Sequence, residues 1–381
     1  MDSDSARFFD TGDEDRETVR LIGRIPVRNL WLLMFYASDL YREQGEEKVL
    51  AEEAPEDLPD LVAELLCTEV KRRLQRNLSF GYQPVERIVH RVRGRIDFLK
   101  SRRLGLERQG KIACRFDEFT VDTPRNRFVR AALDRLVPVL KNSNTVHRCR
   151  SLSLTLMRNG VSGVCPSMSE IAAIRFGRHD TNDRRMISAA RLAFEMAIPS
   201  EQQGARLLPQ LSRDIRWIRH LYEKAVAGFY AVALHADAWS VSTGKILRWP
   251  TASKTNRIDE ILPCMKLDIM LESSSRDERI IIDTKFNSIF TGSRYRENSL
   301  RSGYIYQMYS YLRSQETDDD PLSKRSCGLL LHPSIGETVD EAISIQGHIL
   351  RFATVDLTAS SKDIRRRLLE TVRFPVSFHG A

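Results

Sequence analysis

The chain has 381 residues, of which 42% are hydrophobic and 29% are charged, and its formal net charge at pH 7 is +8. This composition indicates a soluble, folded protein with room for two domains and excludes a disordered chain. No apolar run is long enough to span a membrane, and the acidic N-terminus lacks the basic and then apolar pattern of a signal peptide. The six cysteines are scattered without a C-x-x-C pair, so we expect neither a disulfide framework nor a zinc knuckle, and we expect a cytoplasmic location.

Charge is distributed unevenly along the chain. Residues 1–60 hold 16 acidic and 7 basic side chains, so the positive charge lies in the remainder. A strongly basic body suggests a polyanionic partner, although an unspecialised basic surface would have the same composition. We expect residues 1–20 to be a mobile acidic lead.

Residues 21–200 are expected to form an N-terminal α+β domain. The segment 25–41 predicts a buried helix, and 59–78 predicts an amphipathic helix because its apolar residues recur at helical spacing. The segment 80–103 is interpreted as strands around a turn at Gly94. Its many arginines and lysines suit either phosphate contact or a guarded, solvated strand edge.

The rest of this domain predicts a strand and a helix over 111–140, separated by a turn at 122–124, and then helices over 141–195. Residues 105–112, with sequence GLERQGKI, match the start of a phosphate-binding loop. They end in Ile112 where such a loop needs a hydroxyl for Mg²⁺, and a strand rather than a helix is expected behind them. We therefore expect no hydrolysis of nucleoside triphosphates by this chain itself.

Residues 201–381 are expected to form an α/β domain around a central mixed sheet. The predicted order is a helix, three strands, a helix, two strands and a final helix, which is typical of a sheet covered by helices. The predicted helices span about 214–235, 298–315 and 360–371, and the predicted strands 240–248, 260–271, 279–287, 327–332 and 345–353.

Three charged residues stand in or beside apolar, β-branched runs of this second domain. The runs are KLDIML (266–271), which contains Asp268, and RIIIDTKF (279–286), which contains Asp283 and Lys285. Side chains alternate along a strand, so Asp283 and Lys285 are expected to point the same way. If the two strands are neighbours, two carboxylates and an ammonium group meet at one edge of a sheet.

This combination suits a divalent cation and a hydrolytic water. Mg²⁺ takes oxygen ligands, usually one or two carboxylates together with a substrate phosphate, and it lowers the pKa of a bound water. An ordinary ion pair between Asp283 and Lys285 is the simpler alternative. Three consecutive isoleucines before Asp283 favour a functional site, because an unpaired charge is costly in such surroundings.

Two predicted helices supply further candidates. Glu223 lies in an almost wholly apolar helix and is a candidate third metal ligand, or else a solvated residue near the open end of that helix. Gln307 and Tyr311 are four residues apart in SGYIYQMYSYLR (302–313) and are expected to contact a phosphate or Lys285. Tyr304 and Met308 on the same stripe are expected to be core residues.

The order of these motifs resembles the PD-(D/E)xK nuclease superfamily, with Asp268, Asp283-Thr-Lys285 and Gln307–Tyr311 as the matching residues. Leu267 replaces the proline of the name pattern. Three N-terminal blocks, IPVRNLWLLMFYASDL, VRGRIDF and CRFDEFTVDTPRNRFVRAAL, are similar to those of the McrC subunit of McrBC-type, 5-methylcytosine-directed restriction systems. This likeness covers roughly residues 24–312.

The resemblance implies a Mg²⁺-dependent DNA endonuclease subunit, with Mn²⁺ as an alternative metal. It implies catalysis by Asp268, Asp283 and Lys285 with support from Gln307 and Tyr311, and metal binding by Asp268 and Asp283, aided by Glu223. It also implies that the domain over 21–200 docks on an McrB-like AAA+ GTPase ring and stimulates its GTPase, and that the complex cuts double-stranded DNA. The segment 80–103 then offers contacts with the ring as an alternative to DNA.

Two other functions compete with this one. One is a non-catalytic adaptor that keeps a nuclease fold for assembly. The other is a stand-alone DNA-repair nuclease that needs no motor. Saturable binding of Mg²⁺ would speak against the adaptor, and cleavage without GTP would favour the stand-alone enzyme.

Overall fold

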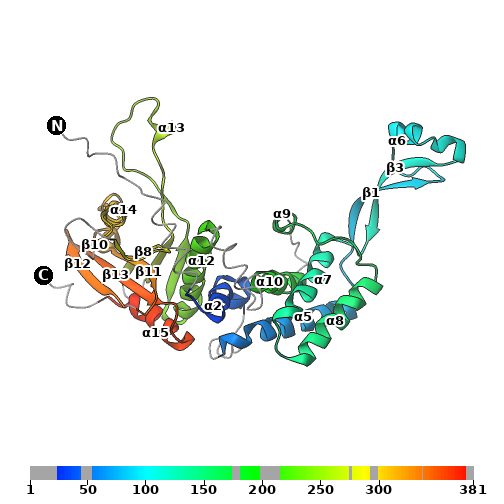
Figure 1. Cartoon of the computed structure of the whole chain (residues 1–381). Coiled ribbons are helices and arrows are strands. Elements are labelled where there is room, and N and C mark those ends of the chain that lie inside the picture. Colours follow the sequence, from blue (N-terminus) through cyan, green and yellow to red (C-terminus); the bar gives the residue numbers. More distant parts are fainter. Residues whose placement is uncertain are drawn as a thin grey trace, which may run out of the picture. The chain divides into compact units, whose positions relative to one another are not determined.

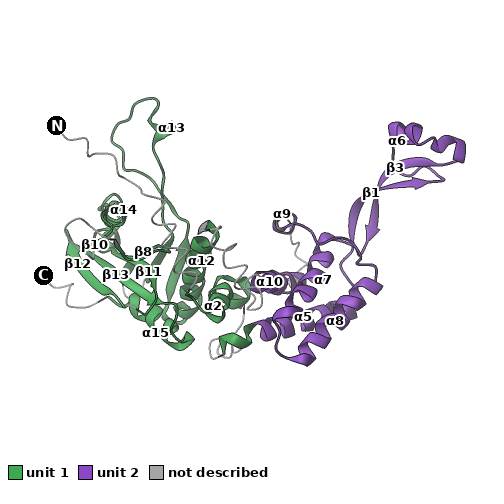
Figure 2. Cartoon of the chain, in the orientation of Figure 1, with its two compact units in different colours: residues 1–58, 198–381 green, residues 59–197 purple. Residues whose placement is uncertain are grey.

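A computed structural model of the chain describes residues 24–43, 54–173, 181–197, 215–273, 277–291, 299–336 and 338–374. The chain divides into two compact units (Figures 1 and 2): unit 1 comprises residues 1–58 and 198–381, and unit 2 comprises residues 59–197. The acidic lead expected at 1–20 lies outside the described residues. No described helix combines the length and the apolar character needed to cross a membrane.

Unit 1 is built on a six-stranded mixed sheet with the order β12-β13-β11-β8-β7-β4. The three strands β8, β11 and β13 are parallel, whereas β12 pairs antiparallel with β13, β7 with β8, and β4 with β7. The strands are β4 (Trp239–Thr243), β7 (Ile269–Ser273), β8 (Glu278–Thr284), β11 (Cys327–Ser334), β12 (Asp340–Ile345) and β13 (His348–Asp356). The central mixed sheet expected from the sequence is therefore present. The edge strand β12 was missed, because its mostly exposed residues mix polar and apolar side chains and give it no apolar run.

Helices cover both faces of this sheet. One face carries α14 (Ser302–Arg313), whose Met308 packs in a core cluster with Ile281 of β8 and Leu330 of β11. On the other side are α12 (Ile215–Ala233) and α15 (Ser361–Thr371), which are joined where the hydroxyl of Tyr230 lies 2.8 Å from that of Thr371. The shorter elements of unit 1 are α3 (Asp39–Glu43), η1 (Pro55–Asp57), η4 (His235–Asp237), β5 (Ile246–Leu247), α13 (Ile258–Ile261), β6 (Met265–Lys266), β9 (Phe290–Thr291), β10 (Ser299–Leu300) and η5 (Pro321–Arg325).

The N-terminal helix α2 (Val27–Ala37) belongs to unit 1, which corrects the assignment of residues 21–200 to one domain. It packs along α12, where Gly228 lets the two backbones approach so closely that a Cβ would lie 2.0 Å from the carbonyl oxygen of Tyr36. The buried amide of Asn29 donates to the carbonyls of Leu357 at 2.7 Å and Ala359 at 3.0 Å. Periodicity could identify this apolar helix but not its packing partner.

Unit 2 consists of helices and a small antiparallel sheet that extends away from them (Figure 2). The sheet order is β1-β3-β2, so β1 and β2 both pair with β3. Strands do flank Gly94, whose φ is +63°, as predicted; they pair with β3, which offers β1 nine partners in register, rather than with each other. The elements of unit 2 are α5 (Leu58–Gln75), β1 (Gly81–Val89), β2 (Arg95–Ile96), α6 (Phe98–Arg103), η2 (Leu106–Gln109), β3 (Ile112–Thr120), α7 (Pro124–Leu136), η3 (Val137–Val139), α8 (Ser143–Arg158), α9 (Met168–Ala172) and α10 (Thr181–Met196).

The GLERQGKI segment forms the short turn η2 and leads directly into β3. A phosphate-binding loop would instead be followed by a helix whose N-terminus faces the phosphates. The strand that was expected behind this segment is therefore confirmed.

Candidate active site

Asp268 and Asp283 face each other at the ends of two neighbouring strands. The strands β7 and β8 are antiparallel with Ile269 opposite Ile282, and the same register continued by one residue sets Asp268 opposite Asp283. Asp283 lies within β8, whereas Asp268 lies in a bend between β6 and β7 rather than within a strand as expected. The two carboxyl groups thus meet at the end of two interior strands.

Asp283 carries an incompletely compensated charge. It is 2% exposed, and its Oδ2 lies 2.8 Å from Nζ of Lys285. The ammonium group of Lys285 is thus paired with this carboxylate, but it does not fully offset the cost of burying the charge. Burial raises the pKa of Asp283 to about 6; Lys285 opposes this shift, and Asp268 adds to it. A further cation would stabilise the charged carboxylate.

Lys285 is held firmly although it follows the last residue of β8. Its backbone N–H donates to the carbonyl of Leu331 at 3.0 Å, which continues the pairing with β11. Its Nζ lies 5.0 Å from the centre of the Tyr304 ring, within the range of a cation–π contact. Burial lowers the pKa of Lys285, but the charges of Asp283 and Asp268 raise it by more, so the net shift is upward. The side chain is therefore an ammonium group at neutral pH.

Asp268 is oriented by Thr284. The backbone N–H and the hydroxyl of Thr284 both donate to Oδ2 of Asp268, at 2.8 and 3.0 Å. The carbonyl of Asp268 accepts a hydrogen bond from the N–H of Gly244 at 3.1 Å. Hydrogen bonds therefore hold the backbone of Asp268 at the end of β4 and its side chain at the end of β8. Sequence reasoning did not assign Thr284 this role, because a threonine at a strand end is too common to be a signal.

Glu223 lies on α12 within electrostatic reach of Asp268. Burial and the charge of Asp268 raise the pKa of Glu223, while its Oε2 lies 3.6 Å from Nδ1 of His220. Within the described parts of the chain, no three His, Cys, Asp or Glu side chains are close enough to hold a metal ion. The three expected metal ligands, Asp268, Asp283 and Glu223, are therefore not arranged around one site, because Glu223 is directed to His220.

Gln307 and Tyr311, one turn apart on α14, form two successive hydrogen bonds. The amide of Gln307 donates to the hydroxyl of Tyr311 at 2.5 Å, and this hydroxyl donates to the carbonyl of Lys266 at 3.1 Å. Burial raises the pKa of Tyr311, so its hydroxyl keeps its proton. Among the described residues neither side chain forms a hydrogen bond with Lys285, although Tyr311 lies within electrostatic reach of it. They instead fix the backbone two residues before Asp268.

Tyr304 packs against the core cluster, as expected, and it also contacts the site. Its hydroxyl accepts a hydrogen bond from the buried amide of Asn287 at 2.6 Å, and its ring faces Lys285. Burial lowers the pKa of the neighbouring His332 to about 3, so His332 is neutral, and its Nδ1 lies 3.1 Å from the carbonyl oxygen of Asn287. The helical stripe shared with Gln307 was a signal that could have identified Tyr304.

The donor set at this site fits Mg²⁺. Asp268 and Asp283 lie opposite each other, and burial keeps the pKa of Asp283 raised in spite of the adjacent Lys285. Mg²⁺ commonly uses one or two carboxylates and keeps waters or substrate oxygens as its remaining ligands. Asp268 and Asp283 would hold such an ion without a third carboxylate.

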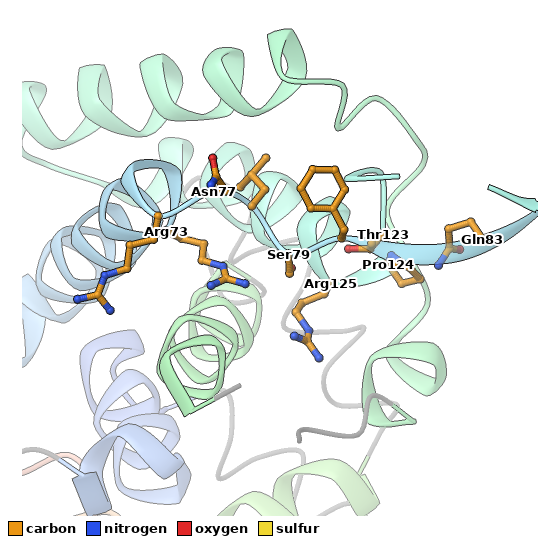
Figure 3. A pocket seen from close by; sticks show the side chains of 11 residues that line it. Arg73, Asn77, Ser79, Gln83, Thr123, Pro124 and Arg125 are labelled. Carbon is orange, nitrogen blue, oxygen red and sulfur yellow. The ribbon is translucent and has the colours of Figure 1, made fainter. Parts of the chain in front are cut away.

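A cavity of about 430 Å³ lies in unit 2, where β1 and α7 begin (Figure 3). None of the predicted catalytic or metal-binding residues lines it. Two of its arginines bind the buried Asp183, with Arg73 Nε at 3.1 Å and Arg125 Nη1 at 2.6 Å from its carboxylate oxygens. These contacts give both arginines a structural role, since they tie α5 and α7 to α10.

Comparison with known proteins gives a consistent result. A family model described as "McrBC 5-methylcytosine restriction system component" matches residues 6–324. The "Type IV methyl-directed restriction enzyme EcoKMcrBC" of Escherichia coli (strain K12) is 25% identical over 346 residues, which cover 91% of this chain and 97% of that protein.

Two solved structures from Thermococcus gammatolerans are also similar. One is a half-complex of McrB AAA+ hexamers with bound McrC, with 14% identity and a TM-score of 0.39 over 83% of this chain and 68% of that one. The other is the McrBC complex, with 15% identity and a TM-score of 0.30 over 53% of this chain and 73% of that one.

Proposed function

The chain belongs to the McrBC 5-methylcytosine restriction system component family, and from this premise we propose that it is the Mg²⁺-dependent DNA endonuclease subunit of such a system. The observation that carries the proposal is the meeting of Asp268, Asp283 and Lys285 at the end of β7 and β8. A structural ion pair would need no second carboxylate opposite Asp283. The PD-(D/E)xK superfamily is the nuclease class that this arrangement resembles.

The proposed role of each side chain follows from its charge. Asp268 and Asp283 are the proposed metal ligands; the bound ion would lower the pKa of water and neutralise charge on the phosphate under attack. Lys285 keeps its proton, because Asp283 and Asp268 raise its pKa. It therefore acts as a fixed positive charge that orients the water and stabilises the negative charge developing on the phosphate, rather than as a general base.

The remaining site residues keep these three in place. Thr284 fixes the carboxylate of Asp268, and Tyr311 fixes the backbone of Lys266 close to it. Tyr304 confines the ammonium group of Lys285 against Asp283. Preorganised charges of this kind need no rearrangement during the reaction, which is why small displacements of the supporting groups reduce rates strongly.

We also propose that the partner is an McrB-like AAA+ GTPase ring, that unit 2 docks on it and stimulates its GTPase, and that the joint substrate is double-stranded DNA. The basic segment 80–103, which includes β1, β2 and α6, is a candidate contact for this ring. The absence of a nucleotide-binding loop at 105–112 in unit 2 agrees with a division of labour in which the partner hydrolyses GTP.

The test compares cleavage of modified DNA with GTP hydrolysis in the reconstituted complex. Asp283→Ala and Lys285→Ala should each abolish cleavage, because they remove a ligand and the fixed charge, while GTPase stimulation survives. Asp318→Ala and Lys324→Ala are matched controls, since these two residues form an exposed ion pair outside the site, and both variants should cut normally.

Cleavage at the wild-type rate by either site variant would refute the assignment. Retained Mg²⁺ binding in Asp268→Ala, with no cleavage by any form of the complex, would favour a non-catalytic adaptor. Efficient cleavage by the purified chain without GTP and without its partner would favour a stand-alone nuclease.

A further inference from the structure

An arm formed by residues 244–266 extends from the sheet directly beside Asp268. Its two strands β5 and β6 continue the antiparallel ladder of β4 and β7 in an unbroken register, with Thr243 opposite Ile269 and Ile246 opposite Lys266. The short helix α13 lies at the far end of the arm, away from the sheet (Figure 1). The backbone that positions Asp268 is therefore also the root of the arm.

The root of this arm is fixed to the body of unit 1. Leu247 and Met265 are 7% and 5% exposed and belong to the core cluster under α14. The side-chain amide of Gln315 donates to the carbonyl of Arg248 at 3.0 Å, and the indole N–H of Trp249 donates to the carbonyl of Pro263 at 2.8 Å. A molecule that binds the arm would thus be held in a defined position relative to the two carboxylates.

Positive charge is concentrated at the root. The arm contains five cationic and two acidic residues, and the acids are engaged towards its far end, where Asp259 pairs with Lys254 at 2.5 Å and Glu260 lies 3.8 Å from Arg257. The other three cations, Lys245, Arg248 and Lys266, are exposed. None of these three has an ion-pair partner within 4 Å in the part of the chain that the structure describes.

The far part of the arm exposes apolar side chains instead. Ile261, the last residue of α13, is 70% exposed, and the next residue, Leu262, is 38% exposed. These two adjacent apolar side chains at the end of an extended arm are available for contact with another molecule. Cations at the root together with apolar residues at the tip match the surface of duplex DNA, which offers phosphates along its backbone and apolar sugar faces in its minor groove.

We infer that the arm of residues 244–266 holds duplex DNA against the carboxylate pair, with Lys245, Arg248 and Lys266 on phosphates and Ile261 and Leu262 against the minor groove. This inference rests on the proposed nuclease function for its choice of partner. A second copy of the chain is a poorer occupant, because it would bring a surplus of the same charge to the root.

Lys266 is the residue through which the arm and the site are most closely linked. It lies two residues before Asp268, and its carbonyl accepts the hydrogen bond from Tyr311. Its charge also lowers the pKa of Glu223, although burial and Asp268 raise that pKa by more. A phosphate bound by Lys266 would therefore be a near neighbour of the phosphate presented to Asp268 and Asp283.

Binding of a labelled DNA duplex to the full chain in EDTA tests this inference without requiring cleavage. The arm variant combines Lys245→Ala, Arg248→Ala and Lys266→Ala. The control variant combines Lys324→Ala, Arg325→Ala and Arg366→Ala, which removes the same charge from residues that are 53%, 52% and 68% exposed outside the arm. Affinity is measured by fluorescence anisotropy as a function of salt concentration.

Each lost phosphate contact should lower the slope of log affinity against log salt by about 0.9, so the arm variant should lose about three units of slope. Between about 50 and 200 mM salt the wild-type affinity should then fall about 40-fold more than that of the arm variant. The control variant should keep the wild-type slope. Ile261→Ser with Leu262→Ser should weaken binding without changing the slope, because it removes no charge.

An arm variant with the wild-type slope and affinity overturns the inference, as does an equal loss in the control variant. A change in self-association measured by sedimentation, with DNA binding unaffected, also overturns it and makes the arm an interface between copies. If the arm variant loses DNA binding as expected but the wild-type complex never cleaves DNA, the arm assignment stands and the nuclease proposal fails.

Discussion

Replacing Asp283 by asparagine should stabilise the metal-free chain while it removes DNA cleavage. Asp283 is buried, and its pKa of about 6 lies well above the ordinary value of 3.8 in spite of the adjacent Lys285. The ionised carboxylate is therefore a source of instability in the folded chain. Asparagine has nearly the same size and carries no charge.

The direction and size of this effect follow from proton linkage. Between about pH 4 and pH 6 the folded chain keeps a proton on Asp283 that the unfolded chain has lost, so wild-type stability falls as the pH rises through this window. The difference of about two pKa units corresponds to about 3 kcal/mol, which is reached above about pH 6 and absent below the unfolded pKa. An asparagine side chain does not titrate, so Asp283→Asn does not lose stability in this pH window.

Thermal unfolding in EDTA, followed by circular dichroism from about pH 3.5 to pH 8, measures the effect. For a unit of this size about 2–4 °C corresponds to 1 kcal/mol, so Asp283→Asn should unfold about 6–12 °C above wild type at pH 8 and together with it near pH 3.5. Asp318→Asn is the control, because that side chain is 94% exposed and its replacement should change the midpoint little. Added Mg²⁺ should raise the wild-type midpoint but not that of the Asp283 variant.

An Asp283 variant less stable than wild type at pH 8 in EDTA would refute this reasoning. It would mean that attraction between the carboxylate and Lys285 outweighs the cost of burial, so that the pair is a stabilising element of the fold. The same result would weaken the argument for a metal site, since a fully compensated carboxylate needs no further cation.

Three other outcomes follow from the same structure. Cleavage by the complex should have an acid limb at or below about pH 6, because Asp283 must lose its proton before it can bind a cation, and a flat pH–rate profile through this range would contradict that role. Tyr304→Ala should lower the cleavage rate about 30-fold, because a desolvated cation–π contact with Lys285 contributes about 2 kcal/mol. Tyr304→Phe should stay close to wild type, and equal rates for both variants in single-turnover assays would contradict this. Gly228→Ala should destabilise unit 1 by about 3 kcal/mol or more, because its Cβ would lie 2.0 Å from the carbonyl of Tyr36, and denaturant unfolding that matches wild type would show that α2 does not pack there.

Local pattern in the sequence was enough for many of the elements and for part of the site. The apolar run before Asp283 identified β8, and strand alternation placed Asp283 and Lys285 on one face, as the ion pair between them shows. The spacing of Gln307 and Tyr311 placed them one turn apart on a helix, and they bond to each other. In each case the information lies in residues a few positions apart, so the geometry of a single helix or strand determines the result.

The partners of these elements depended on the tertiary structure. The register of β7 on β8 sets Asp268 opposite Asp283, and no local pattern distinguishes it from a register shifted along the strand. The association of α2 with α12, the bonds from Thr284 to Asp268 and the contact of Tyr304 with Lys285 likewise join separate positions in the chain. Periodicity reports which face of an element is apolar, whereas the choice of partner depends on which of many possible contacts buries that face best while every backbone group is bonded, and this is a property of the whole folded chain.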